Sequence, residues 1–343
     1  MEMRERNCSE HRDGVQWVHG GSPTTSALMF SAGVLGNVAA LVLLEVRRRR
    51  RKQSARGHSS SCNLFQVLVT ALLVTDLLGT CSVSPLVIAA YARNESLSAL
   101  GGSVVACRYF GFAMTFFSLV TLALLLCMAL ERCLSIAAPY VYERRLSARC
   151  GYLALALVYV SGALFCLAPF FGFGAYVQYS PGTWCFVDMC EQRVYKNLYA
   201  SCLLVMIACT VLCNACVIYH LVLMYRGSAR RFRASTPTRS LAEELERLVL
   251  LAFMTITFLI CSLPLVIRVY ISSLSTNQTL DLLALLLLSM NPILDPWVFI
   301  LLSPPVPRLL WGAVCKVLRP RPLDNKVSLS SCPHTQTTIE LQT

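Results

Sequence analysis

Four polar side chains interrupt some of the most apolar stretches of the sequence. Asp76 stands in LLVTDLLGT, Asn37 in GVLGNVAAL, and Asn291 and Asp295 in LALLLLSMNPILDPWVF. An ionisable group inside a membrane is costly, so each such residue is a candidate functional residue. Two carboxyl and two amide groups could share a hydrated pocket, with or without a cation. They could instead relay protons in a transporter, or make separate hydrogen bonds between helices.

An acid and a base stand side by side in MALERCLSI, where Glu131 precedes Arg132. This dipeptide lies at the end of an apolar run, about 25 residues after Cys107. Glu131 can hold the guanidinium group of Arg132 until a group on the inner face takes it away. The pair is therefore a candidate contact between two conformations.

Three prolines stand inside apolar runs, namely Pro264, Pro292 and Pro296. Proline removes an intrahelical hydrogen bond and clashes with the preceding turn, so helix kinks are expected there. Kinked helices beside a polar pocket form a possible two-state element, but kinks are also common in static membrane bundles.

The composition indicates which elements must position these groups. The 343 residues are 56% hydrophobic and 14% charged, with a mean hydropathy of +0.59, which indicates a membrane protein. A helix crossing a ~30 Å hydrocarbon core needs roughly 20 mostly apolar residues. Seven stretches qualify, at 24–46, 63–91, 104–136, 150–174, 195–225, 247–273 and 280–303. The sequence thus predicts an all-α membrane protein, a seven-transmembrane helix bundle.

The charges orient this bundle. Most of the 30 Lys and Arg residues fall in segments on one side, if the first span enters from outside. Three N-x-S/T sequons, at Asn7, Asn94 and Asn277, all fall on the other side, where glycosylation takes place. We expect a multi-pass plasma-membrane protein with an extracellular N-terminus. The basic residues are spread over loops, so nucleic-acid binding is excluded.

The predicted orientation also assigns the cysteines to the two sides of the membrane. Cys8, Cys107, Cys185 and Cys190 face outside, where disulfides form, and four cysteines allow three pairings. A Cys107–Cys185 bridge would hold the second outer loop over the mouth of the bundle. Cys315 lies near the inner surface and is a candidate for palmitoylation.

Four segments make up the predicted chain. Residues 1–23 form an extracellular N-terminus, and residues 24–303 form the membrane domain. Residues 304–320 show apolar positions at helical spacing with basic residues among them, which indicates a short amphipathic eighth helix along the membrane surface. Residues 321–343 are rich in Ser and Thr and are expected to be disordered.

Several of these motifs together resemble those of rhodopsin-like G-protein-coupled receptors. More narrowly, the chain is similar to prostanoid receptors in MFSAGVLGN, TDLLGT, YARN, AMTFFSL, QYSPGTWCF, MTITF and NPILDPW. The branch it resembles most is the one for E-type and D-type prostaglandins and prostacyclin, which raises cyclic AMP through Gs. The resemblance runs from about residue 25 to residue 320, and PGTWCF is its most specific motif.

The resemblance implies roles for residues already singled out. It implies a Cys107–Cys185 disulfide and an activation segment at Asp295 and Pro296, with Phe299 where most rhodopsin-like receptors have tyrosine. Asp295 would communicate with Asp76. The full set implied for activation and G-protein coupling is Asp76, Glu131, Arg132, Pro264, Asn291, Asp295, Pro296 and Phe299.

The same resemblance implies a ligand site that departs from the family. Prostanoids are carboxylic acids, which family members bind with an arginine in the outer half of the seventh helix. Leu286 occupies that position here. Tyr91, Thr183 and Trp184 match other family positions at the site. Arg268 and Arg108 near the outer mouth could compensate, although Arg268 is expected to face the membrane interface or a headgroup.

The sequence therefore predicts a receptor for a prostanoid, an E-type prostaglandin first, which couples to Gs and raises cyclic AMP. Two alternatives remain. One is a diverged receptor that no longer binds acidic prostanoids because of Leu286, and the other is a transporter or channel. No nucleophile–base pair or metal-ligand cluster indicates an enzyme, and no cofactor is expected.

Overall fold

Seven helices that are long and apolar enough to cross a membrane make up the fold. The computed structural model describes residues 22–54, 64–100, 104–145, 148–189, 193–231, 239–271 and 278–302. The spanning helices are α2 (Pro23–Ser54), α3 (Leu64–Arg93), α4 (Val105–Ala137), α6 (Ala148–Leu167), α7 (Arg193–Arg231), α8 (Arg239–Ile271) and α9 (Gln278–Leu302). They coincide with the seven predicted stretches, so the predicted bundle is confirmed.

Some predictions concern other parts of the chain. The sequons at Asn7 and Asn277, the cysteines at 8, 190 and 315, the amphipathic helix at 304–320 and the tail lie outside the described residues. Asn94 is described. It is exposed in the turn after α3, with a φ of 52°.

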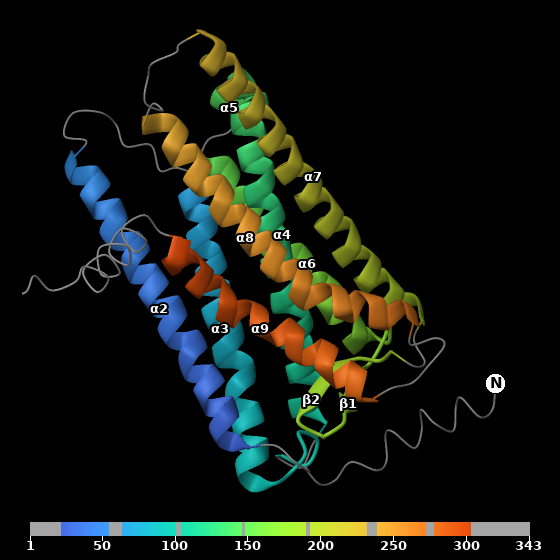
Figure 1. The fold of residues 1–343 in the computed structure, drawn as a ribbon. Coiled ribbons are helices and arrows are strands. Elements are labelled where there is room, and N and C mark those ends of the chain that lie inside the picture. Colours follow the sequence, from blue (N-terminus) through green and yellow to red (C-terminus); the bar gives the residue numbers. More distant parts are fainter. Residues whose placement is uncertain are drawn as a thin grey trace, which may run out of the picture.

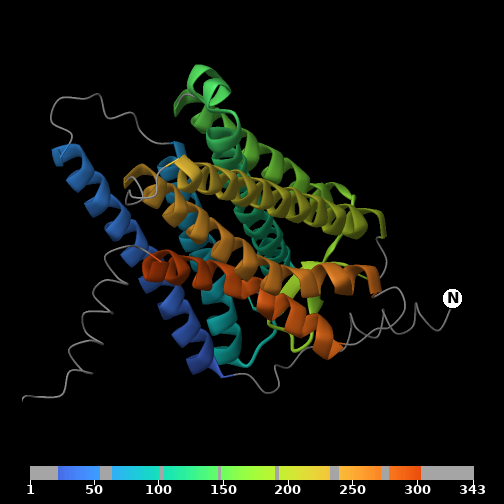
Figure 2. The ribbon, with the colours of Figure 1, turned by 45° about the horizontal axis from the view of Figure 1, so that its top comes forward.

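The helices run between the two ends of the bundle, with α4 in its middle and with α8 and α9 inclined to α3 and α4 (Figures 1 and 2). Of the spanning helices, α4 is the most buried, and α6 is the least. The helix α4 packs against α3, α6, α7 and α8. The hydrophobic core follows from this arrangement, since α4 contributes fully buried side chains such as Phe110, Leu124 and Met128.

Small elements close the two ends of the bundle. The short helix α5 (Pro139–Arg145) follows α4 at one end, and a 3-10 turn η1 (Ala168–Phe171) follows α6 at the other. Beyond η1 the strands β1 (Tyr176–Tyr179) and β2 (Trp184–Val187) pair antiparallel, with Tyr179 opposite Trp184. We call the end with the strands the hairpin end and the end with Arg48–Arg50 the basic end (Figure 1). The all-α prediction missed this hairpin.

The hairpin is held against α4. A disulfide joins Cys107 to Cys185 with a Cα–Cα distance of 5.4 Å, which confirms that prediction. The Tyr176 hydroxyl donates to Cys166 O at 2.8 Å. A Cβ atom at Gly111 would lie 2.6 Å from Cδ1 of Tyr176, so the glycine permits this close approach. Trp184 packs edge-on against Phe110, with ring centroids 5.7 Å apart. The hairpin is thus a fixed cover over the bundle.

Candidate functional site

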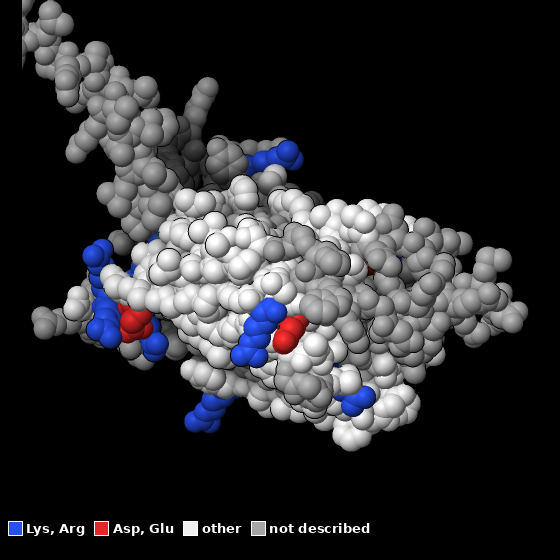
Figure 3. All heavy atoms as spheres, turned by 90° about the horizontal axis from the view of Figure 1, so that it is seen from below, with Lys and Arg blue, Asp and Glu red and all other residues white. Residues whose placement is uncertain are grey.

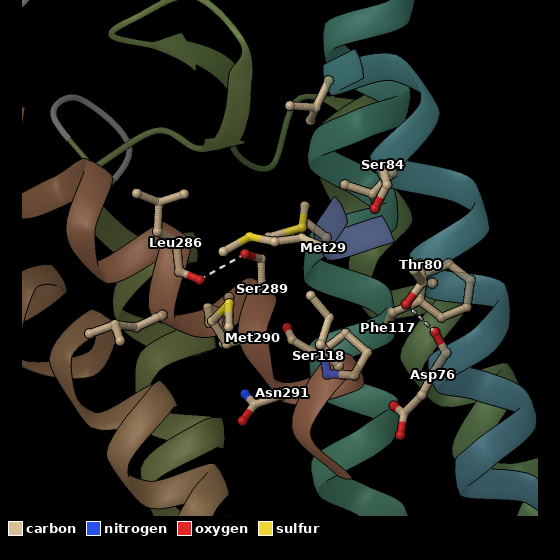
Figure 4. A pocket seen from close by; sticks show the side chains of 18 of the residues that line it. Met29, Asp76, Thr80, Ser84, Phe117, Ser118, Leu286, Ser289, Met290 and Asn291 are labelled. Atoms are coloured by element: carbon tan, nitrogen blue, oxygen red, sulfur yellow. Dashed lines mark hydrogen bonds between the residues drawn. The ribbon is translucent and has the colours of Figure 1, made fainter. Parts of the chain in front are cut away.

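A cavity of about 510 Å³ lies between α2, α3, α4 and α9, beneath Trp184 of β2. It extends from the hairpin end toward the middle of the bundle, where Asp76 and Asn291 lie at its lower end (Figure 4). Leu286 and Met29 lie nearer the hairpin. A volume of this size is typical of small-molecule sites.

Apolar side chains make up most of the cavity wall, with hydroxyl and amide groups among them. The polar lining residues are Ser22, Thr25, Ser26, Thr75, Asp76, Thr80, Ser84, Tyr91, Ser118, Thr121, Ser289 and Asn291. Asp76 is the one ionisable acid in this lining, and no Lys, Arg or His is present among the described residues that form it. The cavity can bind an elongated apolar molecule that carries several uncharged polar groups.

The end of the cavity under the hairpin brings together three of the predicted ligand residues, Tyr91, Trp184 and Leu286. Thr183 is fully buried behind them, and its Oγ1 donates to the Tyr91 hydroxyl oxygen at 3.2 Å. Because that oxygen accepts from Thr183, the Tyr91 hydrogen is left to donate to a molecule in the cavity. The side chain of Leu286 is 38% exposed and lines the cavity (Figure 4).

Arg268 does not line this cavity. Its Nε donates to Asp281 Oδ1 at 2.7 Å, and the side chains are only 9% and 10% exposed. The prediction that Arg268 faces the membrane interface or a headgroup is therefore wrong, because a carboxyl group on α9 pairs with it inside the protein. Arg108 is exposed on α4 and is also absent from the lining.

The predicted polar residues meet at the lower end of the cavity and just beyond it. Asn37 Nδ2 donates to Gly33 O and to Pro292 O, both at 2.9 Å. The second acceptor is the carbonyl oxygen of a proline inside α9. Thr121 Oγ1 donates to Asp76 Oδ1 at 3.1 Å. Asn291 Nδ2 donates to Ser262 Oγ at 3.2 Å. This cluster links α2, α3, α4, α8 and α9.

The two carboxyl groups of this cluster are poorly satisfied. Asp76 and Asp295 are 1% and 0% exposed, and their charges are close enough to interact. Among the described residues, neither Asp295 carboxyl oxygen has a hydrogen-bond partner, and neither does Asp76 Oδ2. Separate, fully satisfied hydrogen bonds therefore do not describe these carboxyl groups. A cluster with unused acceptors can exchange partners when the helices shift.

At the basic end, Glu131 holds Arg132 as the sequence suggested. Arg132 Nε donates to Glu131 Oε2 at 2.5 Å and its Nη2 donates to Oε1, with both residues 3% exposed. The Arg132 guanidinium group also lies 4.8 Å from the ring centroid of Phe65. The Tyr142 hydroxyl on α5 donates to Glu131 Oε1 at 2.7 Å. Burial, and then Glu131, raise the pKa of Tyr142 to about 12, so it stays a donor.

The remaining activation residues lie on α8 and α9. Pro264 is inside α8, and Pro292 and Pro296 are inside α9, while both helices continue past them. Phe299 is buried in the last turns of α9, toward the basic end of the bundle.

Sequence reasoning missed Asp281, Thr121 and Tyr142. Asp281 is an acid inside the seventh apolar stretch, so the rule that selected Asp76 would have found it. Thr121 and Tyr142 carry no comparable signal, because threonine and tyrosine are ordinary residues in membrane helices and loops.

The fold and the two polar ends define a seven-helix membrane receptor. A family model described as "7 transmembrane receptor (rhodopsin family)" matches residues 36–299. Squid rhodopsin has a similar fold, with a TM-score of 0.65 and 15% identity, covering 86% of this chain and 84% of that one. The chain belongs to the rhodopsin family of receptors and is a multi-pass plasma-membrane protein.

Sequence relatives narrow the class. The prostaglandin E2 receptor EP2 subtype of Homo sapiens is 46% identical, covering 97% of this chain and 95% of the human protein. The canine EP2 receptor is also 46% identical, covering 97% and 94%. The human prostacyclin receptor is 42% identical, covering 90% of this chain and 80% of that protein. The chain belongs to the prostanoid receptor family, and the transporter or channel alternative is set aside.

Proposed function

We propose that this receptor binds a prostanoid, an E-type prostaglandin most closely, and activates Gs to raise cyclic AMP. The observation that carries the proposal is the cavity beneath the hairpin, with Tyr91, Trp184 and Leu286 at one end. Its size and its apolar wall with scattered hydroxyl groups suit a lipid mediator. The names of the EP2 and prostacyclin receptors support the ligand class.

The hairpin end faces the outside and the basic end faces the cytosol in this proposal. Arg48, Arg49 and Arg50 at the end of α2 support that orientation, because cytosolic segments carry an excess of basic residues. The exposed sequon residue Asn94 follows α3 at the hairpin end, and Arg48, Arg49 and Arg50 of α2 lie at the other end of the bundle. The cavity then opens toward the extracellular side.

Ligand binding shifts a population between two states. In the resting arrangement Glu131 holds the Arg132 side chain, and the Tyr142 hydroxyl donates to Glu131. Asp76 at the lower end of the cavity and Asp295 have carboxyl oxygens without hydrogen-bond partners among the described residues, and they can exchange partners as α8 and α9 move. Arg132 then becomes available to the G protein.

The test is a cyclic AMP assay in cells that express the chain, titrated with E-type and D-type prostaglandins and prostacyclin analogues, each as acid and as methyl ester. Cells expressing Arg132→Ala at equal surface level are the matched control for coupling. A response of the unmodified chain that the control lacks supports the proposal. If a compound binds to these cells without raising cyclic AMP, coupling to Gs is excluded. If no compound binds and none raises cyclic AMP, a prostanoid ligand is excluded.

A further inference from the structure

We infer that the natural ligand is an uncharged derivative of a prostanoid acid, neutral at the end that lies under the hairpin, where Tyr91 and Leu286 line the cavity. An ester, an amide or an alcohol meets that requirement, and a carboxylate does not. The inference rests on the proposed function, since it names the chemical class of a prostanoid-like ligand for the same cavity.

The charges around the cavity disfavour an anion. Among the described residues that line it, no side chain is basic and the ionisable acid is Asp76. A carboxylate that entered this cavity would lose its hydration, and no cation in the described lining would compensate for that loss. Asp76, when ionised, would also repel it. An uncharged carbonyl or hydroxyl group loses less hydration and is not repelled as an anion would be.

Arg268, the candidate cation on α8, is already paired with a carboxylate. Arg268 is 8% exposed, and Asp281 binds it at 2.7 Å across the α8–α9 contact. Asp188 and Lys196 are also buried at this end, at 3% exposure each. Arg268 therefore belongs to a buried ion pair outside the cavity lining.

The donors that remain suit a neutral acceptor. Thr183 directs its hydroxyl hydrogen to Tyr91, which leaves the Tyr91 hydrogen for one ligand oxygen. One neutral donor satisfies an ester or amide carbonyl, whereas a carboxylate has room for several donors and prefers charged ones. Leu286, which also lines the cavity toward the hairpin, adds an apolar side chain instead of a second donor (Figure 4).

The outer surface agrees with this chemistry. Figure 3 looks onto the hairpin end, where most of the described surface is uncharged and basic side chains lie beside acidic ones, one such group near the middle of the face. A continuous basic patch would concentrate an anion at the mouth of the cavity, and the described part of this face has none.

The experiment measures ligand-induced thermal stabilisation of the purified full-length receptor at pH 7.4, which does not depend on any G protein. The probes are an E-type prostaglandin, its methyl ester, its primary amide and the corresponding alcohol. Leu286→Arg is compared with Leu280→Arg, a residue that is 44% exposed on the same helix and absent from the cavity lining.

We expect the unmodified chain and Leu280→Arg to bind the neutral probes more tightly than the acid. Leu286→Arg should improve the affinity for the acid by about 10- to 200-fold, the effect of one charge-assisted hydrogen bond. Acid binding that equals or exceeds ester binding in the unmodified chain overturns the inference and leaves the proposed function standing. An equal response of the two arginine variants overturns the placement of the ligand end at Leu286. Failure of all four probes overturns the proposed function, and the inference with it.

Discussion

The buried charges near the hairpin and those in the middle of the bundle are handled in opposite ways. Arg268 and Asp281 form a close ion pair between α8 and α9. Asp76 and Asp295 are buried at least as deeply, but they have like charges when ionised and leave carboxyl oxygens without hydrogen-bond partners among the described residues. The first arrangement fixes two helix ends, and the second leaves room for exchange.

This difference separates a structural role from a signalling role. A buried ion pair holds its partners in place, because breaking it leaves an uncompensated charge. A cluster with unused acceptors gains hydrogen bonds if its helices shift, so more than one arrangement is accessible to it. Four sets of substitutions test this difference.

The largest effect is expected at the ion pair. Arg268→Met or Asp281→Leu alone should destabilise the receptor by about 3–5 kcal/mol, because each leaves one buried charge without its partner. The double variant should recover most of that loss, since both charges are gone. Thermal unfolding of the purified receptor and surface expression check this. A double variant as unstable as the worse single variant would contradict it.

Glu131→Gln should have the next largest effect, on signalling. The amide keeps the shape of the side chain but removes the charge that holds Arg132, which weakens the contact by about 1.5–3 kcal/mol. Basal G-protein activation should therefore rise by roughly 10-fold or more. Nucleotide exchange on added Gs in isolated membranes measures it, with the receptor amount matched. Unchanged basal exchange would show that Glu131 does not restrain Arg132.

Asp76→Asn should cost no stability, in contrast to Asp281→Asn. The amide removes the repulsion with Asp295 and keeps an oxygen that can accept from Thr121. We expect the free energy of unfolding to stay within about 1 kcal/mol of the original value or to rise. The Asp281→Asn variant, measured in the same thermal unfolding series, should fall clearly below it. Equal losses would remove the distinction between the two regions.

Tyr142→Phe should give the smallest effect, a several-fold rise in basal exchange, because it removes one hydrogen bond to Glu131 and weakens the hold on Arg132 only indirectly, by about 1 kcal/mol. The pKa of Tyr142 is raised from 10.0 to about 12. Its contribution is therefore complete below pH 10 and is lost as the pH rises through 12. The difference in basal exchange between Tyr142→Phe and the unmodified receptor should be constant from pH 6 to pH 9. A change within that range would show that another group titrates.

The sequence predicted the spanning helices because each one carries a long apolar run that no soluble fold requires. It also predicted the Glu131–Arg132 contact, because the two residues are neighbours on one helix. The strand β2 escaped prediction because all four of its residues are buried, so it shows no alternation of apolar and polar positions. Its partner β1 is equally short.

Contacts between distant residues were out of reach for a related reason. The Arg268–Asp281 pair joins two helices across a connection, and either residue alone is compatible with a lipid headgroup or a ligand. The cavity takes its lining from five helices and the hairpin, and no local pattern encodes how their side chains face one another. Only the resemblance pointed to Tyr91 and Leu286 together.

The central claim is that the cavity under the hairpin is the ligand site, and saturation binding tests it most directly. Ala113 lines the cavity, so Ala113→Trp should fill it, whereas Ala156 is exposed on α6 and Ala156→Trp serves as the control. Labelled E-type prostaglandin, as acid and as methyl ester, should lose at least about 100-fold in affinity for Ala113→Trp, and bind Ala156→Trp normally at matched surface expression. Undiminished binding to Ala113→Trp would contradict the claim and place the ligand elsewhere.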